Sequence, residues 1–273
     1  PKRRRVNAND MGKEEFELFF EELRLQQGFD DLDEMLRVGA EKNEVLNDRM
    51  EEIAEDMGLT YHRAPPKGRE RSTEKVNGKY GGRVNMLSDV ARTGVTVNDP
   101  KQIDEILKRL SKPDMYHVIY EDFRMTELGY FDAKASLIDT DGFIKEIQFY
   151  PTGMYRAKMK KAKGGAGGHE AYKITRETWR PLAQRYEAVQ EQLRIYGEAQ
   201  SALPEAFADL IGKLPRSAPL TFAEMAASEE LISGLRMSPR ISDGDILSQD
   251  LVSRNQPYAS EPSSDIAAST KPS

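Results

Sequence analysis

The sequence predicts an α+β protein in which helices flank a mixed β-sheet and a largely disordered tail follows. Three observations support this fold class. Helical periodicity dominates residues 13–57, residues 84–148 fit the order strand, helix, strand and hairpin, and Ser, Pro and Asp become frequent from residue 238. We expect a flexible basic segment at 1–12, one domain at 13–200, and a Pro/Ser-rich tail with short helices at 201–273.

Composition excludes several classes of function. The chain has 273 residues, is 38% hydrophobic and carries a net charge of −6, so it is no general polyanion binder. The absence of Cys removes disulfides, thiolate metal sites and cysteine nucleophiles. No apolar run is long enough for a membrane span or signal peptide, so we expect a soluble, cytoplasmic protein without a membrane partner.

Two helices are expected near the start. Apolar residues recur with helical spacing from Phe16 to Leu23, and again over residues 32–57. Gly28 and Gly58 are placed to end these two helices. The Phe residues of the first helix are interpreted as core packing.

Residues 61–82 combine many cations with Pro65, Pro66 and four glycines. Because Pro and Gly interrupt regular structure, we expect a loop here rather than a long helix or strand. The clustered cations could close over phosphates. The alternative is a solvated basic loop.

The next segments predict a sheet. Val95 and Val97 alternate with Thr96, which indicates a half-buried strand, and Asp89 lies just before it. A helix should begin at Asn98-Asp99-Pro100, with apolar residues at helical spacing up to residue 110. Residues 116–120 resemble a further strand.

A hairpin is expected around Asp141-Gly142. Neighbouring side chains of a strand point to opposite faces, so Glu146 and Gln148 should share a face while Ile147 points away. Further on, the glycine run at 164–168 lacks the context of a phosphate loop and is interpreted as a flexible link. Residues 169–199 should be helical, and Pro181 should kink or divide them.

Two carboxylates in this predicted sheet could share one Mg²⁺. Asp89 precedes one strand and Glu146 lies on another, and hard divalent cations prefer carboxylate oxygens. Cations from residues 67–75 would neutralise a polyphosphate in the same cleft. The alternative is that both acids are surface residues at a sheet edge.

Five motifs, in this order, resemble the RelA/SpoT-type nucleotidyltransferase domain, the synthetase of the alarmones ppGpp and pppGpp. The resemblance covers roughly residues 13–200, and its motifs are Lys67–Lys75, Asp89–Arg92, Gly129–Lys134, Glu146–Gln148 and His169–Tyr172. It implies a nucleotidyltransferase-like core, Mg²⁺ as cofactor, and transfer of the β,γ-pyrophosphate of ATP to a ribose 3′-hydroxyl.

The resemblance also implies roles for single residues. Asp89 and Glu146 are the expected catalytic carboxylates and metal ligands, and Glu146 could also activate the acceptor hydroxyl. Tyr130 is similar to the tyrosine that stacks on the acceptor base, with Lys134 and Gln148 beside it. The residues expected at the ATP phosphates are Lys67, Arg69, Arg71, Ser72, Lys75 and Arg92.

Departures from the family pattern concern the acceptor. Phe131 and Lys134 stand where long alarmone synthetases commonly carry arginine and histidine, and Arg92 precedes Gly94 where they usually place glycine first. The acceptor could be a guanine nucleotide (GDP or GTP), an adenine nucleotide or the 3′ end of tRNA. The histidines are His62, His117 and His169, so hydrolysis of the product is not expected.

Two classes of function stay open. One is a Mg²⁺-dependent pyrophosphokinase, either an alarmone synthetase or a toxin-like relative that modifies RNA. The other is a catalytically degenerate fold that serves as a nucleotide-binding or interaction module in a phage or effector protein, which could be delivered to the cytoplasm. In both classes the chain could form a homo-oligomer or bind a protein partner through its tail.

Overall fold

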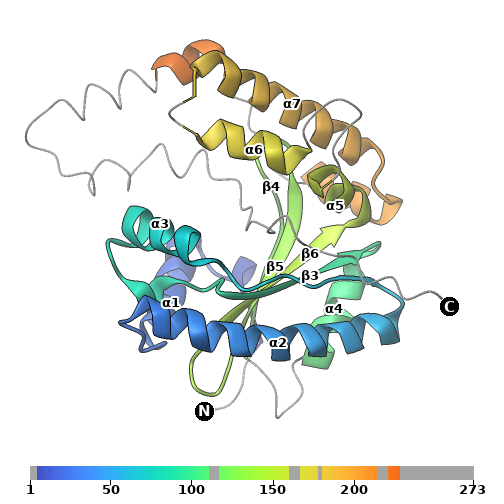
Figure 1. Cartoon of the computed structure of the whole chain (residues 1–273). Coiled ribbons are helices and arrows are strands. Elements are labelled where there is room, and N and C mark those ends of the chain that lie inside the picture. The colour runs from blue at the N-terminus through green and yellow to red at the C-terminus, as the bar shows by residue number, and fades with distance from the viewer. Residues whose placement is uncertain (1–4, 111–116, 160–166, 178–179, 214–220, 228–273) are drawn as a thin grey trace, which may run out of the picture. The chain divides into compact units, whose positions relative to one another are not determined.

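The computed structural model describes residues 5–110, 117–159, 167–177, 180–213 and 221–227. The chain divides into two compact units. The first comprises the described residues of Pro1–Phe123 and Asp132–Tyr150, and the second comprises Arg124–Phe131 and the described residues of Pro151–Glu261. The fold is α+β, as predicted (Figure 1). Most of the expected tail and part of the glycine run lie outside the described residues.

Six strands form one mixed sheet in the order β1-β4-β5-β6-β3-β2. Strand β1 pairs in parallel with β4, whereas β2 pairs antiparallel with β3 and β5 with β6. The strands are β1 (Arg5–Asn7), β2 (Thr60–His62), β3 (Ala91–Val97), β4 (His117–Met125), β5 (Phe131–Ile138) and β6 (Ile144–Pro151). We expected a flexible segment at 1–12; the structure places residues 5–7 of it in the sheet, followed by the 3-10 turn η1 (Ala8–Asp10).

The β5–β6 hairpin turns where predicted, and Glu146 and Gln148 share one face of β6 as predicted. Lys134 lies opposite Gln148 and Ser136 opposite Glu146, so these polar residues share one face of the sheet. The turn contains Gly142 at φ +87°, a conformation that favours glycine. Two hydrogen bonds close it: Asp139 N–H donates to the Phe143 carbonyl at 3.0 Å, and Phe143 N–H donates to Asp141 Oδ1 at 3.1 Å.

Two of the predicted helices pack against the sheet. Helix α2 (Leu32–Met57) contacts β2 and β3, and α4 (Pro100–Leu110) contacts β3 through its apolar side. Figure 1 shows α2 running alongside β3. All seven residues of β3 are buried. The expectation of a half-buried strand was therefore wrong, because β3 is an interior strand of the sheet and is covered on both faces.

The first helix has the predicted core role, and α2 ends at Gly58 as predicted, whereas the first helix ends at Leu25, three residues before the expected Gly28. Helix α1 (Lys13–Leu25) buries Phe16 and Phe20, whose rings stack at 5.7 Å between centroids. Helix α2 begins after Asp31, whose carboxylate accepts the Glu34 N–H at 2.8 Å, and ends at Gly58 with φ +64°.

The loop expected at 61–82 is instead largely helical. Strand β2 occupies its start, and α3 (Arg69–Tyr80) occupies its second half, before the 3-10 turn η2 (Val84–Met86). Pro65 and Pro66 precede the helix, and Gly81, at φ +58°, ends it. The prediction was wrong because most of these Pro and Gly residues mark the ends of the helix and do not interrupt its interior.

The second unit is helical apart from its strand ends. It contains α5 (Thr152–Met159), α6 (Gly168–Arg176), α7 (Leu182–Ser201), the 3-10 turn η3 (Glu205–Phe207) and α8 (Ala208–Lys213). Helix α6 packs against α7, and Pro181 directly precedes α7, so it divides the helical region as predicted. In the described part of the chain, no helix combines the length and apolar character that a membrane crossing requires.

A cluster of charges attaches the β5–β6 turn to α2. Lys42 Nζ lies 2.8 Å from Asp139 Oδ2 and 2.7 Å from Asp141 Oδ2. The Lys145 ammonium, whose side chain is 2% exposed, lies 2.8 Å from Asp139 Oδ1. Burial acts to lower the pKa of Lys42, but the two carboxylates outweigh it and raise that pKa.

Replacing Asp139 by Asn should destabilise the fold strongly, because Lys145 would lose a buried counter-charge. We expect the free energy of unfolding, measured by denaturant titration, to fall by about 3 kcal/mol. Glu41→Gln is the control: Glu41 pairs with Arg37 on the exposed side of α2, and its loss should cost about 0.5 kcal/mol at most. Equal losses in the two variants would contradict the prediction.

Candidate active site

The candidate site is built around the carboxylate of Asp89. Asp89 lies between η2 and β3 and is 3% exposed. Its Oδ2 accepts hydrogen bonds from two ammonium groups, Lys67 Nζ at 2.6 Å and Lys75 Nζ at 2.9 Å. The loop before α3 supplies Lys67 and the middle of α3 supplies Lys75. The misassigned segment 61–82 thus carries two of the cations that sequence reasoning placed here.

The charges of this trio shift one another's pKa values. Burial acts to raise the pKa of Asp89, but Lys75 and Lys67 outweigh it and hold that pKa well below its usual value. Burial lowers the pKa of Lys67, and repulsion from Lys75 and Arg92 adds to this effect against the attraction of Asp89. Burial also acts to lower the pKa of Lys75, but the attraction of Asp89 and other groups outweighs it and raises that pKa.

A second carboxylate, Glu146 of β6, acts on the same ammonium group. Its charge contributes to the raised pKa of Lys75. Glu146 Oε2 lies 3.4 Å from Lys134 Nζ of the neighbouring strand β5. Both side chains are largely buried, with 14% of Glu146 and 10% of Lys134 exposed. The hairpin therefore brings together two of the predicted site residues, and Lys75 connects them with Asp89.

Each carboxylate keeps one oxygen that could take a metal ion. Asp89 Oδ1 and Glu146 Oε1 are buried and have no hydrogen-bond partner among the described residues. Buried acceptors without a partner are costly, and carboxylate oxygens are the ligands that Mg²⁺ prefers. The donor set therefore fits Mg²⁺. No cluster of three or more His, Cys, Asp or Glu side chains suited to a metal occurs in the described residues.

Ser72 lies on α3, one turn before Lys75, so the two side chains share a helix face. It is fully buried, and its Oγ has no hydrogen-bond partner in the part of the chain that the structure describes. This hydroxyl is a further group that a ligand oxygen could satisfy.

The predicted arginines have different positions. Arg92 is buried at the start of β3, where its Nε donates to the Pro65 carbonyl at 3.2 Å and its charge affects Lys67. Arg69 instead forms an exposed ion pair with Asp33 of α2, and Arg71 pairs with Glu74 along α3. The structure groups Arg92 with the lysines and does not group Arg69 or Arg71 with them.

Gln148 of β6 belongs to a short polar network on the face that carries Glu146. The Tyr150 hydroxyl donates to Gln148 Oε1, and Gln148 Nε2 lies 3.5 Å from Asp132 Oδ2. An ionised carboxylate only accepts hydrogen bonds, so it fixes the amide orientation with its amino group toward Asp132. Sequence reasoning named Asp132 among the residues that select the acceptor but assigned no role to Tyr150, although Tyr150 follows the two-residue period of Gln148.

The Tyr150 ring occupies a space that Gly94 leaves open on β3. A Cβ atom at Gly94 would lie 2.6 Å from Tyr150 Cε2, much closer than a normal contact. The edge of the His62 ring also faces Tyr150, at 6.1 Å between centroids. The glycine therefore allows this tyrosine to reach Gln148.

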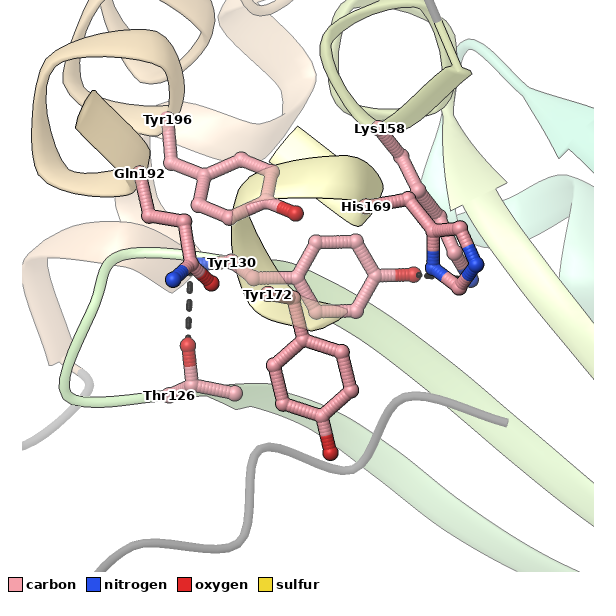
Figure 2. A pocket seen from close by; sticks show the side chains of 7 residues that line it. All are labelled: Thr126, Tyr130, Lys158, His169, Tyr172, Gln192 and Tyr196. Atoms are coloured by element: carbon pink, nitrogen blue, oxygen red, sulfur yellow. Dashed lines mark hydrogen bonds between the residues drawn. The ribbon is translucent and has the colours of Figure 1, made fainter. Parts of the chain in front are cut away.

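Tyr130, the predicted base-stacking residue, lies in the second unit. It is 2% exposed and lines a cavity of about 10 Å³ with Lys158, His169, Tyr172 and other side chains (Figure 2). Lys158 Nζ donates to the Tyr130 hydroxyl at 3.2 Å. The cavity has room for about one water molecule and not for a nucleobase. Stacking on a base would require the Tyr130 ring to become accessible.

The ionised form of Asp89 should stabilise the fold down to low pH. Its pKa in the folded protein lies below the usual 3.8, so its stabilising effect is present above pH 3.8 and disappears as pH falls through the folded pKa. The free energy of unfolding of Asp89→Asn should therefore be about 3 kcal/mol lower than that of wild type at neutral pH. Urea titrations from neutral to acid pH should show the difference from wild type shrinking below pH 3.8. A constant difference would refute this account.

Gly94→Ala should displace the Tyr150 ring and break its bond to Gln148. Overpacking of this kind costs about 1–3 kcal/mol, which denaturant titration would measure. Gly78→Ala is the control, because nothing lies within 4 Å of a Cβ at this helical position. It should stabilise α3 by about 0.5–1 kcal/mol. If Gly94→Ala leaves the stability unchanged or raises it, the Tyr150 ring can move aside at little cost and the prediction is wrong.

Comparison with known proteins gives matches only among solved structures. No protein-family model matches the chain, and no curated protein does. A chain in the crystal structure of the complex between the type VI effector Tas1 and its immunity protein is 18% identical, with a TM-score of 0.46. That match covers 62% of this chain and 96% of the other.

Two further structures are similar. The small alarmone synthetase 1 from Bacillus subtilis, bound to its product pppGpp, is 14% identical with a TM-score of 0.46, over 66% of this chain and 94% of that one. A GTP pyrophosphokinase family protein from Streptococcus pneumoniae is 14% identical with a TM-score of 0.39, over 63% and 90%. All three matches are distant, with TM-scores below 0.5 and sequence identities of 14–18%.

Proposed function

We propose that the chain is a Mg²⁺-dependent pyrophosphokinase that transfers pyrophosphate from ATP to the 3′-hydroxyl of a nucleotide or of tRNA. The observation that carries this proposal is the buried trio of Asp89, Lys67 and Lys75, with Glu146 acting on the same lysine. Two carboxylates and several cations in one buried cluster suit a reaction in which phosphate charge must be held and neutralised.

The lysines can hold Asp89 and phosphate together. An ammonium group has three donors, and Asp89 takes one from each of Lys67 and Lys75. Remaining donors can contact the oxygens of a polyphosphate. Arg92 and the Ser72 hydroxyl supply further donors near this position.

The two free carboxylate oxygens define the catalytic roles. Mg²⁺, when bound, would polarise the phosphate oxygens and neutralise their charge. Asp89 Oδ1 would hold this ion. Glu146 Oε1 would help to hold it or accept the proton of the acceptor hydroxyl, while Lys134 keeps the carboxylate oriented through Oε2.

On the acceptor side, the proposal uses Lys134 and Gln148 of the first unit. The amide orientation fixed by Asp132 would let Gln148 discriminate donors from acceptors on the bound nucleotide. GDP or GTP, an adenine nucleotide and the 3′ end of tRNA are the acceptors to be compared. Action as an effector or phage protein in the cytoplasm belongs to this proposal as well.

A nucleotide-binding module without catalysis is the second candidate. It is favoured by the position of both lysines, whose ammonium groups pair with Asp89 Oδ2 and neutralise its charge. A phosphate group could bind such a cluster without being transferred.

Transfer of label from ATP separates the two candidates. With Mg²⁺ and γ-labelled ATP, we expect AMP release and label in one of GDP, GTP, AMP or bulk tRNA. Glu146→Gln should lower the rate by about 100-fold or more, because it removes the proton acceptor. Glu52→Gln, an exposed change on α2, is the matched control and should keep the wild-type rate. Absence of label from every acceptor, with ATP still bound, would favour the binding module.

A further inference from the structure

Asn43 of α2 is a buried polar residue with a bridging role. It is 1% exposed. Its Oδ1 accepts the Arg92 backbone N–H at 2.7 Å, and its Nδ2 donates to the Ala64 carbonyl at 2.8 Å. A buried amide is costly unless hydrogen-bonded, and here backbone groups from two different segments satisfy its two ends.

The two bridged segments are those that carry the central ion pair. Ala64 lies three residues before Lys67, and Arg92 lies three residues after Asp89. The Asn43 amide therefore joins the loop that delivers the ammonium group to the strand start that delivers the carboxylate.

Two more hydrogen bonds link the same segments. Lys67 N–H donates to the Val90 carbonyl at 2.9 Å, and Arg92 Nε donates to the Pro65 carbonyl at 3.2 Å. Both of these hydrogen bonds join the two segments directly, without a side chain from another helix or strand. Asn43 is distinct because it belongs to α2 and fixes both segments to the helix that packs on the sheet.

We propose that Asn43 is a positioning residue that sets the spacing between Lys67 and Asp89. Lysine has a long and flexible side chain, so its ammonium group can be held 2.6 Å from Asp89 Oδ2 only if the two backbones keep their relative position. Sites of this kind need their groups held within roughly 0.5 Å. The expected effect of Asn43 on the use of ATP rests on the proposed function. Its effect on the distance between Lys67 and Asp89 does not.

Asn47, one turn later on α2, provides a matched control. It is fully buried, its Nδ2 donates to the Ala64 carbonyl at 3.1 Å, and its Oδ1 accepts the Tyr61 hydroxyl at 2.5 Å. It holds the same loop as Asn43 but, among the residues that the structure describes, makes no hydrogen bond to β3. If the Asn43 side chain is removed, the Ala64 carbonyl still accepts a hydrogen bond from Asn47. The Arg92 backbone N–H, in contrast, loses its acceptor.

The test compares Asn43→Ala, Asn43→Asp and Asn47→Ala. We expect Asn43→Ala to lower kcat/KM for ATP by about 10- to 100-fold, with the acceptor KM changed less than about twofold. Lys67 should react faster with acetic anhydride at mildly alkaline pH, as read by mass spectrometry. Asn43→Asp, which retains an acceptor for Arg92, should show smaller changes. Asn47→Ala should lower the melting temperature comparably but affect Lys67 and ATP less.

Opposite results would overturn the proposal. It fails if Asn43→Ala and Asn47→Ala lose ATP activity in proportion to lost stability, or if Lys67 labelling stays at the wild-type rate in Asn43→Ala. Should wild type transfer no pyrophosphate, the proposed function fails and the labelling alone decides this inference. If the Asn43 variants do not fold, amide hydrogen exchange of the wild-type protein provides the test. Equal opening free energies for the Lys67 and Arg92 amides would support the proposal that the two segments are held together. Unequal opening free energies would refute it.

Discussion

The cost of burying the Asp89 carboxylate is the constraint on which the rest of the first unit depends. A buried charge must be paired, and two ammonium groups from separate positions around α3 pair this one. That pairing requires the loop before α3, the helix itself and the start of β3 to keep a fixed arrangement. The hydrogen bonds of Asn43, Lys67 and Arg92 supply it. The polar groups of the candidate site are thus also part of the structure that holds this unit together.

The sequence allowed the parts of the fold with local signals to be predicted. Alternation predicted which residues of β6 share a face, and a turn glycine predicted the hairpin. Gly58 predicted the end of α2, and alternating Val residues placed β3 after Asp89. Helix α3 was missed because Pro and Gly give the same local signal at a helix end as in a loop. The burial of β3 on both faces depends on its neighbours in the sheet, which its own sequence does not show.

The candidate site was predictable in its centre and less so around it. A basic segment followed by an acidic residue led us to expect that these side chains would meet. The structure does bring together Lys67, Lys75 and Asp89. Arg69 and Arg71 are equally basic, but helical geometry directs them to surface partners, and composition cannot distinguish these cases. Asn43 gave no signal, since a polar residue in an amphipathic helix usually faces solvent and its partners lie 21 and 49 residues away. The sequence motifs also did not predict that Tyr130 and Gln148 belong to different units.

The two outermost strands of the sheet, β1 and β2, are each three residues long. An edge strand exposes N–H and C=O groups that another chain can pair with, and the number of these groups grows with its length. Within the described residues, these edges are therefore too short to template a long intermolecular ladder. Self-association through β1 or β2 would therefore have little backbone to use.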